Sequence, residues 1–326
     1  MNRCNRRDFI KSASILPFAA AAIAGLANPL SVFAQLSIKP AGGAPLKTSL
    51  NAYSFNMMLS NQINHLSSGV TLLQVLDFAA KSGFEGFDAT CYYFPGYPQR
   101  AKDSYVKELK QRAADLGLGI SGTGVRNSFT TSDKTVRAAG IELVKTWVEV
   151  SALLGAPVMR VFADTQNNLT WHDVAKGYTR DQVQDWMVAD ISQCAQHGKQ
   201  YGVCIGVQNH GDFIQTGDQL MSLVNAVGSE WCRPIVDTGH FATKDPYADI
   251  AVVAPHAVNW QIKQSPFGEQ SDIPTDLVKL LRIIRNSGYH GYLPIETLSP
   301  MGKPYDPYTV VPAFLKKLQG AIAQTA

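Results

Sequence analysis

The sequence has few cysteines for its length, and none of them shows the spacing of a metal or redox motif. It contains five cysteines in 326 residues. Four of them lie beyond the N-terminal segment and form neither a zinc-ribbon pattern nor a Cys-x-x-Cys motif: Cys91, Cys194, Cys204 and Cys232. This pattern excludes a zinc ribbon. We predict that these four side chains are buried thiols and that they form no structural disulfide.

The chain also lacks an excess of charge once residues 1–34 are set aside. Its 29 basic and 26 acidic residues include four basic and one acidic residue in that segment, which leaves 25 of each. A neutral chain does not favour nucleic acid as a partner. The longest apolar stretch, Ile15–Leu26, is too short to span a membrane. We therefore expect no nucleic-acid partner and no stable membrane anchor.

Residues 1–34 have the order of a signal peptide. A basic start precedes the short apolar stretch, and Val32-Phe33-Ala34 offers a small-x-small cleavage site. The segment Asn5–Lys11 resembles a twin-arginine motif, in which Arg6, Arg7, Phe9 and Lys11 match. An ordinary signal with a basic start is the alternative. We predict export to the periplasm by the twin-arginine pathway, a linker over 35–46 and one folded domain over 47–326.

Short apolar segments alternate with longer amphipathic ones through the rest of the chain. Strands are predicted at 49–55, 86–90, 119–124, 158–163, 203–208, 233–238, 258–263 and 292–297. Helices are predicted at 72–82, 102–116, 133–154, 181–201, 217–227, 247–253, 275–287 and 310–324. Eight strand–helix units predict a single-domain α/β fold, a (β/α)8 TIM barrel.

Glycines support this arrangement. Five predicted helices are followed directly by a glycine that can end a helix in the left-handed conformation: Gly83, Gly117, Gly155, Gly202 and Gly288. A doubly wound open sheet is the alternative fold. No glycine-rich phosphate-binding sequence follows the first predicted strand, which disfavours that alternative.

Polar residues end four consecutive predicted strands. They are found in the segments Gln208-Asn209-His210, Asp237-Thr238-Gly239-His240, Gln261-Ile262-Lys263 and Glu296-Thr297. Carboxyl ends of barrel strands surround one cavity, so these side chains are predicted to converge on a site. Two long loops, 91–100 and 164–180, lie on the same face. Their aromatic residues Tyr92, Tyr93, Phe94 and Tyr97 either stack on a sugar or pack against the barrel top.

These strand ends resemble the xylose isomerase-like barrel family, which includes sugar isomerases, ketose 3-epimerases, dehydratases and endonuclease IV. The resemblance covers most of residues 47–320. Asp237 and Glu296 look like the family's metal-binding carboxylates, and His240 looks like its substrate-contacting histidine. By the same resemblance, the candidate substrate contacts are Arg160, Asn209, Tyr53 and Tyr93.

Two departures concern the metal quartet, which would comprise Gln208, Asp237, Gln261 and Glu296. The family has Glu where this chain has Gln208 and His where it has Gln261. Amide oxygens can ligate a hard cation but bring no charge. The all-oxygen set predicts a weakly bound divalent ion, Mn or Mg.

The resemblance implies chemistry that begins with proton abstraction next to a carbonyl. Because Gln208 cannot accept a proton, Glu296 is the candidate base, with His210, His240 and Lys263 as further acids or bases. Lys263 either steadies an enolate oxygen or pairs with Glu296. With one carboxylate base, isomerisation or elimination is easier to draw than two-base epimerisation.

We therefore predict an exported sugar isomerase or epimerase acting on an unphosphorylated sugar or derivative. A keto-sugar lyase or dehydratase and a non-catalytic periplasmic sugar-binding protein are the alternatives. A DNA-repair endonuclease is disfavoured because the histidines of its zinc cluster and a basic groove are missing. The segment Tyr305–Tyr308 is a candidate oligomerisation surface.

Overall fold

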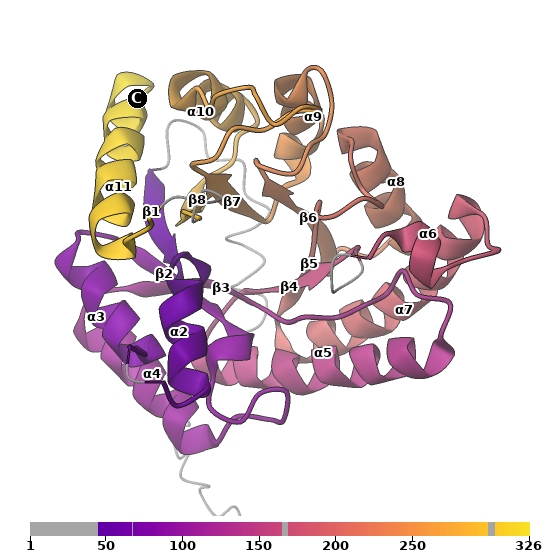
Figure 1. Cartoon of the computed structure of the whole chain (residues 1–326), viewed down its shortest axis with the longest axis horizontal. Helices are drawn as coiled ribbons and strands as arrows, with labels where there is room; N and C mark the ends of the chain where they lie inside the picture. Colours follow the sequence, from indigo (N-terminus) through magenta and orange to yellow (C-terminus); the bar gives the residue numbers. More distant parts are fainter. Residues whose placement is uncertain (1–44, 67, 165–168, 299–303) are drawn as a thin grey trace, which may run out of the picture.

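The computed structural model describes residues 45–66, 68–164, 169–298 and 304–326. The predicted signal peptide at 1–34 and nearly all of the predicted linker at 35–46 lie outside these residues. The described part of the chain forms one closed barrel of eight parallel strands, ringed by helices (Figure 1). This arrangement confirms the predicted (β/α)8 fold.

The strands follow one another around the barrel in sequence order, and β8 pairs with β1 to close it. Their bounds are β1 Leu46–Asn51, β2 Gly86–Thr90, β3 Gly119–Gly124, β4 Val158–Phe162, β5 Cys204–Gln208, β6 Cys232–Asp237, β7 Asn259–Lys263 and β8 Gly291–Glu296. Because the strands are parallel, all their carboxyl ends open on the same face of the barrel.

Helices connect the strands and pack on the outside of the barrel. The larger ones are α3 Leu72–Lys81, α4 Asp103–Asp115, α5 Lys134–Leu154, α7 Arg180–Tyr201, α8 Gly217–Val227, α9 Pro246–Val253, α10 Leu277–Asn286 and α11 Pro307–Gln324. The strand-to-helix loops carry α2 Asn56–Ile63, α6 Trp171–Val174 and the 3-10 helices η1 Ala52–Phe55 and η2 Cys91–Tyr93. A third 3-10 helix, η3 Ala254–His256, follows α9.

Local side chains set where the helices begin and end. The Asp133 carboxylate caps the N-terminus of α5 by accepting hydrogen bonds from the backbone N–H groups of Thr135 and Val136. Gly155 ends the same helix with φ 91°. The other four glycines predicted to end helices also have positive φ, which confirms the role read from their positions.

The first strand was predicted at 49–55, but β1 begins earlier, at Leu46, and ends earlier, at Asn51. The chain leaves the barrel after Asn51, because the Asn51 side chain accepts a hydrogen bond from the backbone N–H of Tyr53 and begins η1 there. Helices α2 and α6, which lie on the carboxyl face of the barrel, were not predicted. Both are short helices within loops: α2 has eight residues and a weak amphipathic pattern, and α6 has four residues.

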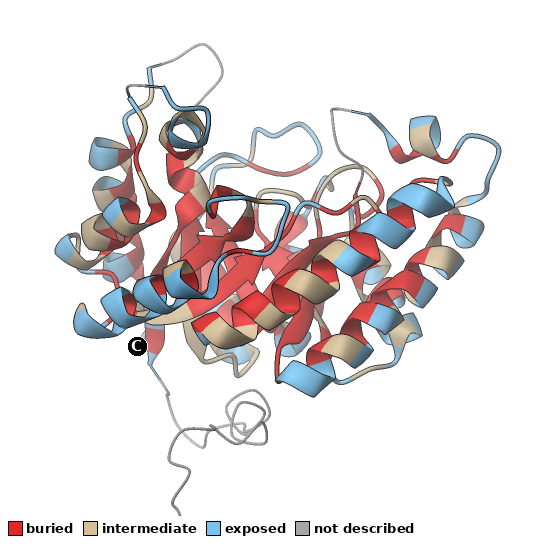
Figure 2. Cartoon of the chain, turned by 90° about the horizontal axis from the view of Figure 1, so that it is seen from below, coloured by how far each residue is buried: buried red, intermediate tan, exposed pale blue. Residues whose placement is uncertain are grey.

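Buried residues, red in Figure 2, make up the strands and the helix faces that pack on the barrel, and most of them are apolar. Cys91, Cys194, Cys204 and Cys232 are free thiols and all are buried, as predicted. Among the described residues, no helix has both the length and the apolar character needed to cross a membrane.

Candidate active site

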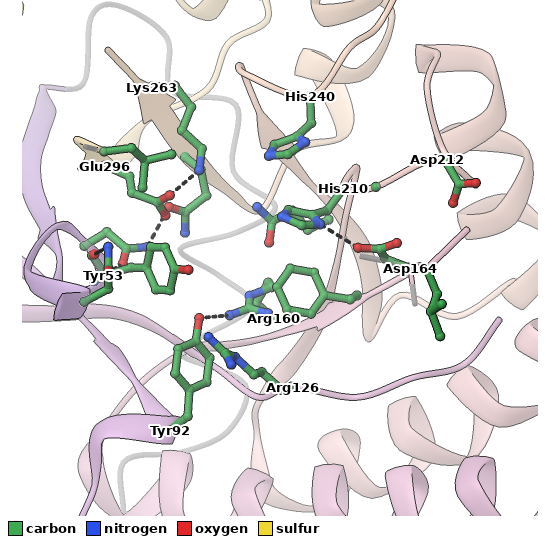
Figure 3. Close-up of a pocket in the computed structure, with 18 of the residues that line it drawn as sticks. Tyr53, Tyr92, Arg126, Arg160, Asp164, His210, Asp212, His240, Lys263 and Glu296 are labelled. Carbon is green, nitrogen blue, oxygen red and sulfur yellow. Dashed lines mark hydrogen bonds and ion pairs between the residues drawn. The ribbon is translucent and has the colours of Figure 1, made fainter. Parts of the chain in front are cut away.

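A cavity of about 880 Å³ opens at the carboxyl ends of the strands. That volume is in the range of small-ligand sites. Glu296, Lys263, His240, His210 and Arg160 line it from five different strands or the turns that follow them (Figure 3). The structure therefore shows that the strand ends converge on one cavity, as predicted.

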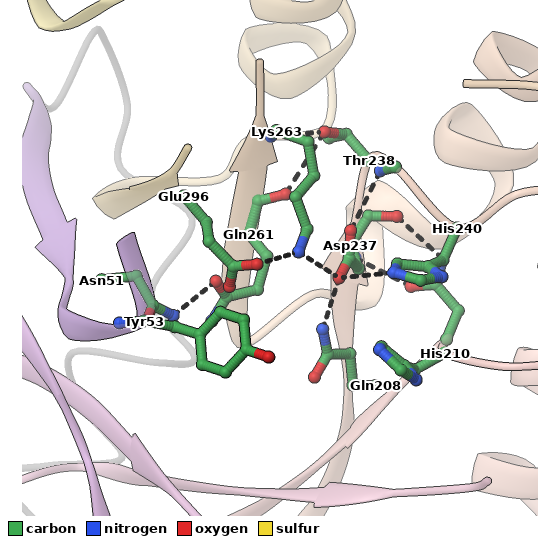
Figure 4. A network of polar contacts seen from close by, with 12 residues as sticks. Asn51, Tyr53, Gln208, His210, Asp237, Thr238, His240, Gln261, Lys263 and Glu296 are labelled. Carbon is green, nitrogen blue, oxygen red and sulfur yellow. Dashed lines mark hydrogen bonds and ion pairs between the residues drawn. The ribbon is translucent and has the colours of Figure 1, made fainter. Parts of the chain in front are cut away.

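Lys263 lies between the two carboxylates of the predicted metal quartet, Asp237 and Glu296 (Figure 4). Its Nζ is 3.4 Å from Asp237 Oδ2 and forms a close ion pair with Glu296 Oε1. Lys263 and Glu296 are register partners on neighbouring strands, which explains their contact. All three side chains are buried: Lys263 is 3% exposed, Asp237 0% and Glu296 6%.

The two glutamines of the quartet are held by protein partners. Gln208 Nε2 donates to Asp237 Oδ2 at 2.5 Å. Gln261 Oε1 accepts from Asn51 Nδ2 at 2.6 Å. Gln261 is the register partner of Asp237, so these two members of the quartet lie side by side on neighbouring strands. Its polar atoms are turned toward one another and toward Asn51 and Lys263.

This donor set does not fit the predicted divalent cation. The Lys263 ammonium contacts both carboxylates that would have supplied the negative charge, and a second cation beside it would be repelled. Gln208 presents N–H to Asp237, and Gln261 has its oxygen engaged. Across the described residues, no group of three or more His, Cys, Asp and Glu side chains is arranged to hold a metal ion.

Two histidines form the opposite wall. The rings of His210 and His240 lie against each other, with centroids 4.1 Å apart and planes tilted by 34°. His210 Nδ1 lies 2.7 Å from Asp164 Oδ2, and the Asp164 carboxylate is held close because Gly211, which follows His210, has no Cβ to meet it. His240 Nε2 is 3.8 Å from Asp237 Oδ2.

Burial and neighbouring charge shift the protonation of several groups. Burial lowers the pKa of His240, partly opposed by Asp237 and reinforced by His210 and Lys263, so His240 is neutral at pH 7. Burial alone would lower the pKa of Lys263, but Asp237 and Glu296 raise it above its ordinary value, so the ammonium is retained. His240 therefore departs from the ordinary histidine pKa that the sequence analysis assumed.

Arginine and tyrosine form a third wall. Arg160 is 7% exposed, and its guanidinium donates to the backbone carbonyl of Val125 at 2.9 Å and to the Tyr92 hydroxyl at 3.3 Å. The Arg126 guanidinium lies over the Tyr92 ring, 4.5 Å from its centroid. Tyr53, a predicted substrate contact, also lines the cavity.

Two predicted substrate contacts do not line the cavity. Tyr93 is 6% exposed and packs beneath Tyr92, which takes the lining position instead. Asn209 is 0% exposed and ties β5 to β6, since its side chain bonds both the backbone N–H and the carbonyl of Asp237. Phe94 and Tyr97 of the proposed aromatic wall pack on Trp147 of α5. For these residues the packing interpretation holds.

The structure also places residues in the cavity that the sequence analysis did not select. They are Asn51, Asn56, Arg126, Asp164 and Asp212. Asp164 follows β4 almost directly, so its strand-end position was a usable signal. Arg126 and Asp212 lie in loops with no pattern that distinguishes them from surface charges.

The closed parallel barrel, with a polar, charged cavity at its strand ends, is that of a (β/α)8-barrel protein. The chain belongs to the xylose isomerase-like TIM barrel family, whose profile matches residues 76–318. This finding confirms the family resemblance of the strand-end motifs.

Solved structures share the fold at low identity. The D-psicose 3-epimerase of Clostridium cellulolyticum H10 is 14% identical with a TM-score of 0.66, over 86% of this chain and 98% of that one. The 3-keto-D-glucoside 4-epimerase of E. coli is 14% identical with a TM-score of 0.63, over 85% and 100%. A xylose isomerase-like TIM barrel/4-hydroxyphenylpyruvate dioxygenase fusion protein is 18% identical with a TM-score of 0.64; this chain spans only 43% of its length.

Proposed function

We propose that the protein is a sugar isomerase or epimerase-type enzyme that removes a proton next to the carbonyl of an unphosphorylated sugar or sugar derivative. The observation that carries the proposal is that Glu296 and the Asp164–His210 pair line the same cavity from different strands. Epimerisation needs one group to take the proton and another to return it from the opposite face, whereas a single base can do both in an isomerisation. Epimerases with this fold act on sugars by their names, which supports the substrate class.

Glu296 is the candidate base. Lys263 holds its Oε1, and its Oε2 has no hydrogen-bond partner among the described residues. Asp237 is the other carboxylate of the quartet, but at 0% exposure it is enclosed by Gln208, Lys263 and Gly239. Glu296 is therefore the quartet carboxylate that reaches a ligand.

His210 is the candidate second proton carrier. When its Nδ1–H donates to Asp164, the carboxylate fixes the ring and leaves Nε2 as a proton acceptor on the cavity side. This pairing supplies the second proton-transferring group that Gln208 cannot supply. His240, neutral and lying against His210, supports the ring position.

A lyase or dehydratase acting on keto-sugars is the second candidate. It shares the first step, the removal of a proton by Glu296. Because Gln208 is not a carboxylate and Asp237 is enclosed, Glu296 is the one quartet carboxylate that is not enclosed. The two reactions diverge after the enolate forms: the proton returns to carbon in an isomerase or epimerase, whereas a β-substituent leaves in a lyase.

Proton exchange in D2O tests the proposal. Unphosphorylated keto-sugars and keto-glycosides are incubated with the protein, with EDTA and separately with Mn²⁺ or Mg²⁺, and the products are analysed by NMR. We expect deuterium at a carbon next to the carbonyl, or an eliminated product. Glu296→Gln should lower the exchange rate by about 10² to 10⁴-fold. Glu108→Gln, a change at an exposed residue of α4, should leave that rate unchanged. A ligand that binds without any exchange would instead support a sugar-binding protein.

Export by the twin-arginine pathway is a further part of the proposal. Its support is the sequence of residues 5–11 and the apolar stretch that follows. An enzyme in the periplasm would meet sugars and glycosides rather than phosphorylated cytoplasmic intermediates, which agrees with the proposed substrate class.

A further inference from the structure

We propose that the Lys263 ammonium takes the electrostatic role that a divalent cation would have in this barrel, so that the site works without a metal ion. The observation is geometric: Lys263 Nζ contacts Asp237 Oδ2 and Glu296 Oε1, the two charged members of the predicted quartet (Figure 4). The absence of a metal ion is inferred from these contacts alone. The action of the ammonium on a substrate rests on the proposed function.

The fold prepares this position for a lysine. Residues 261 and 263 are two apart on β7, so both side chains point into the barrel. The backbone N–H of Lys263 donates to Thr238 Oγ1 at 2.9 Å, which anchors the residue to the turn after β6. Gly239 lies in that turn, and a Cβ there would come within 2.7 Å of Lys263 Cγ. The glycine therefore leaves room for the lysine stem.

With Lys263 in place, the cluster carries one net negative charge instead of the two that a divalent ion would meet. Gln208 has no charge, so Asp237 and Glu296 are the two anions of the quartet, and Lys263 already neutralises one unit between them. An ammonium has three N–H donors. Two face Asp237 and Glu296, and the third has no partner among the described residues and lies at the cavity.

That third donor has a defined use in proton abstraction. As Glu296 Oε2 takes the proton from carbon, the C–H electron pair forms the enolate double bond, and the carbonyl oxygen becomes negative. The Lys263 N–H donates to that oxygen, which is the stabilisation expected of a fixed cation in a buried site. The proton therefore moves from carbon to Glu296, the electron pair of the C–H bond stays on the substrate, and Lys263 keeps its proton.

Metal binding tests the proposal without a known substrate. The purified protein is dialysed against EDTA, its metal content is measured by mass spectrometry, and Mn²⁺ binding is followed by EPR and calorimetry. We expect no stoichiometric metal and a Kd for Mn²⁺ weaker than about 1 mM. The variant Gln208→Glu/Gln261→His/Lys263→Met rebuilds a charged quartet and removes the ammonium. It should bind Mn²⁺ at least about tenfold more tightly than the wild type, with Lys263→Met alone as the matched control.

One metal ion bound to the wild type with micromolar Kd would overturn the inference. A folded triple variant, checked by circular dichroism, that binds no more tightly than the wild type would also count against it. If the triple variant does not fold, the wild-type measurement decides. The exchange assay separates the two proposals: exchange that needs Mn²⁺ or Mg²⁺ contradicts the role of Lys263 but keeps the proposed function, whereas no exchange in any condition contradicts the function alone.

A second, independent observation concerns the substrate. Arg126 and Arg160, which we term the arginine pair, both line the cavity, and no carboxylate oxygen of the described residues lies within 4.0 Å of either guanidinium. Arg160 is buried in a space that depends on Gly124, where a Cβ would come within 2.7 Å of the guanidinium. Tyr92 contacts both arginines (Figure 3).

We infer that the substrate is a sugar acid whose carboxylate binds the arginine pair. A buried arginine such as Arg160 is ordinarily paired with an anion, and the exposed Arg126 lines the same cavity. A guanidinium matches a carboxylate with two parallel hydrogen bonds. The inference deepens the proposed function by naming a substrate class. A sugar phosphate would offer similar chemistry and is therefore included as a separate arm of the test.

Ligand binding measured by calorimetry tests the inference without turnover. Glucuronate, glucose and glucose 6-phosphate are compared on the wild type, on Arg126→Gln and on Arg282→Gln, an exposed residue of α10. We expect glucuronate to bind at least about tenfold more tightly than glucose, and Arg126→Gln but not Arg282→Gln to remove that preference. Equal binding of glucuronate and glucose, a preference for the phosphate, or no binding of glucuronate at millimolar concentration would overturn the inference.

Discussion

At the residue scale, the barrel interior contains buried ionisable side chains that its packing does not require. Asp88 is the clearest case, because it is 4% exposed and no cation lies within 4.0 Å of its carboxylate among the described residues. Its Oδ2 lies 3.5 Å from Asn259 Nδ2, and a Cβ at Gly122 would come within 2.7 Å of it. Burial raises the pKa of Asp88 to about 7, partly opposed by Arg160.

This shift predicts a pH-dependent stability. Between pH 4 and 7 the folded protein keeps the Asp88 proton and the unfolded chain loses it, so the free energy of unfolding falls as the pH rises. A shift from 3.8 to about 7 corresponds to about 4 kcal/mol. Asp88→Asn should therefore be more stable than the wild type at pH 7.5 by a few kcal/mol, measured by urea unfolding.

The same variant provides its own control at pH 4. There Asp88 is protonated in the folded protein and resembles the amide, so the two proteins should have nearly equal free energies of unfolding. A stability gain of the same size at both pH values would show that the effect comes from packing and not from the buried carboxylate.

Asp164 supplies the second prediction at this scale. It accepts from His210 at 2.7 Å and is mostly buried, so it orients the ring that is proposed to carry the second proton. Asp164→Asn should lower the rate of proton exchange by about 10²-fold and change ligand affinity little. Exchange rates and calorimetric Kd values check this prediction. The control is Asp181→Asn, a change at an exposed residue of α7. An unchanged rate would remove His210 from the proposed role.

At the element scale, strand and helix positions followed from local patterns. Seven of the eight predicted strands agree with the structure to within one residue at each end. They were predictable because apolar runs, turn glycines and helix caps act over a few residues. The exception, β1, ends at a side chain-to-backbone hydrogen bond of Asn51, which no hydrophobic pattern reveals.

Helix α10 provides a matched test of this packing. It has one strongly apolar face, on which Leu281 is 0% exposed, while the neighbouring Arg282 points outward. Leu281→Ala should lower the free energy of unfolding by about 2 to 5 kcal/mol through lost burial and an added cavity. Arg282→Ala should change it by less than about 0.5 kcal/mol. Comparable losses for the two variants in urea unfolding would contradict the packing assigned to α10.

At the scale of the whole molecule, the barrel is closed by β8 on β1, which brings Glu296 and Asn51 beside residues from the middle of the chain. The N-terminal segment adds a separate property, the proposed export. In a fusion of residues 1–46 to a reporter protein, Arg6→Lys/Arg7→Lys should abolish twin-arginine export, measured by fractionating the periplasm. Continued export of that variant would favour the ordinary signal peptide instead.

The sequence by itself determined the barrel, the helix ends and the level at which polar residues meet, because these depend on local periodicity and on the shared direction of parallel strands. Only the tertiary structure decided which polar groups touch. Asn51 bonds Gln261 across 210 residues of chain, Lys263 enters the quartet, and Tyr92 replaces Tyr93 at the cavity. Such pairings depend on strand register and side-chain packing between distant segments, and no local pattern encodes them.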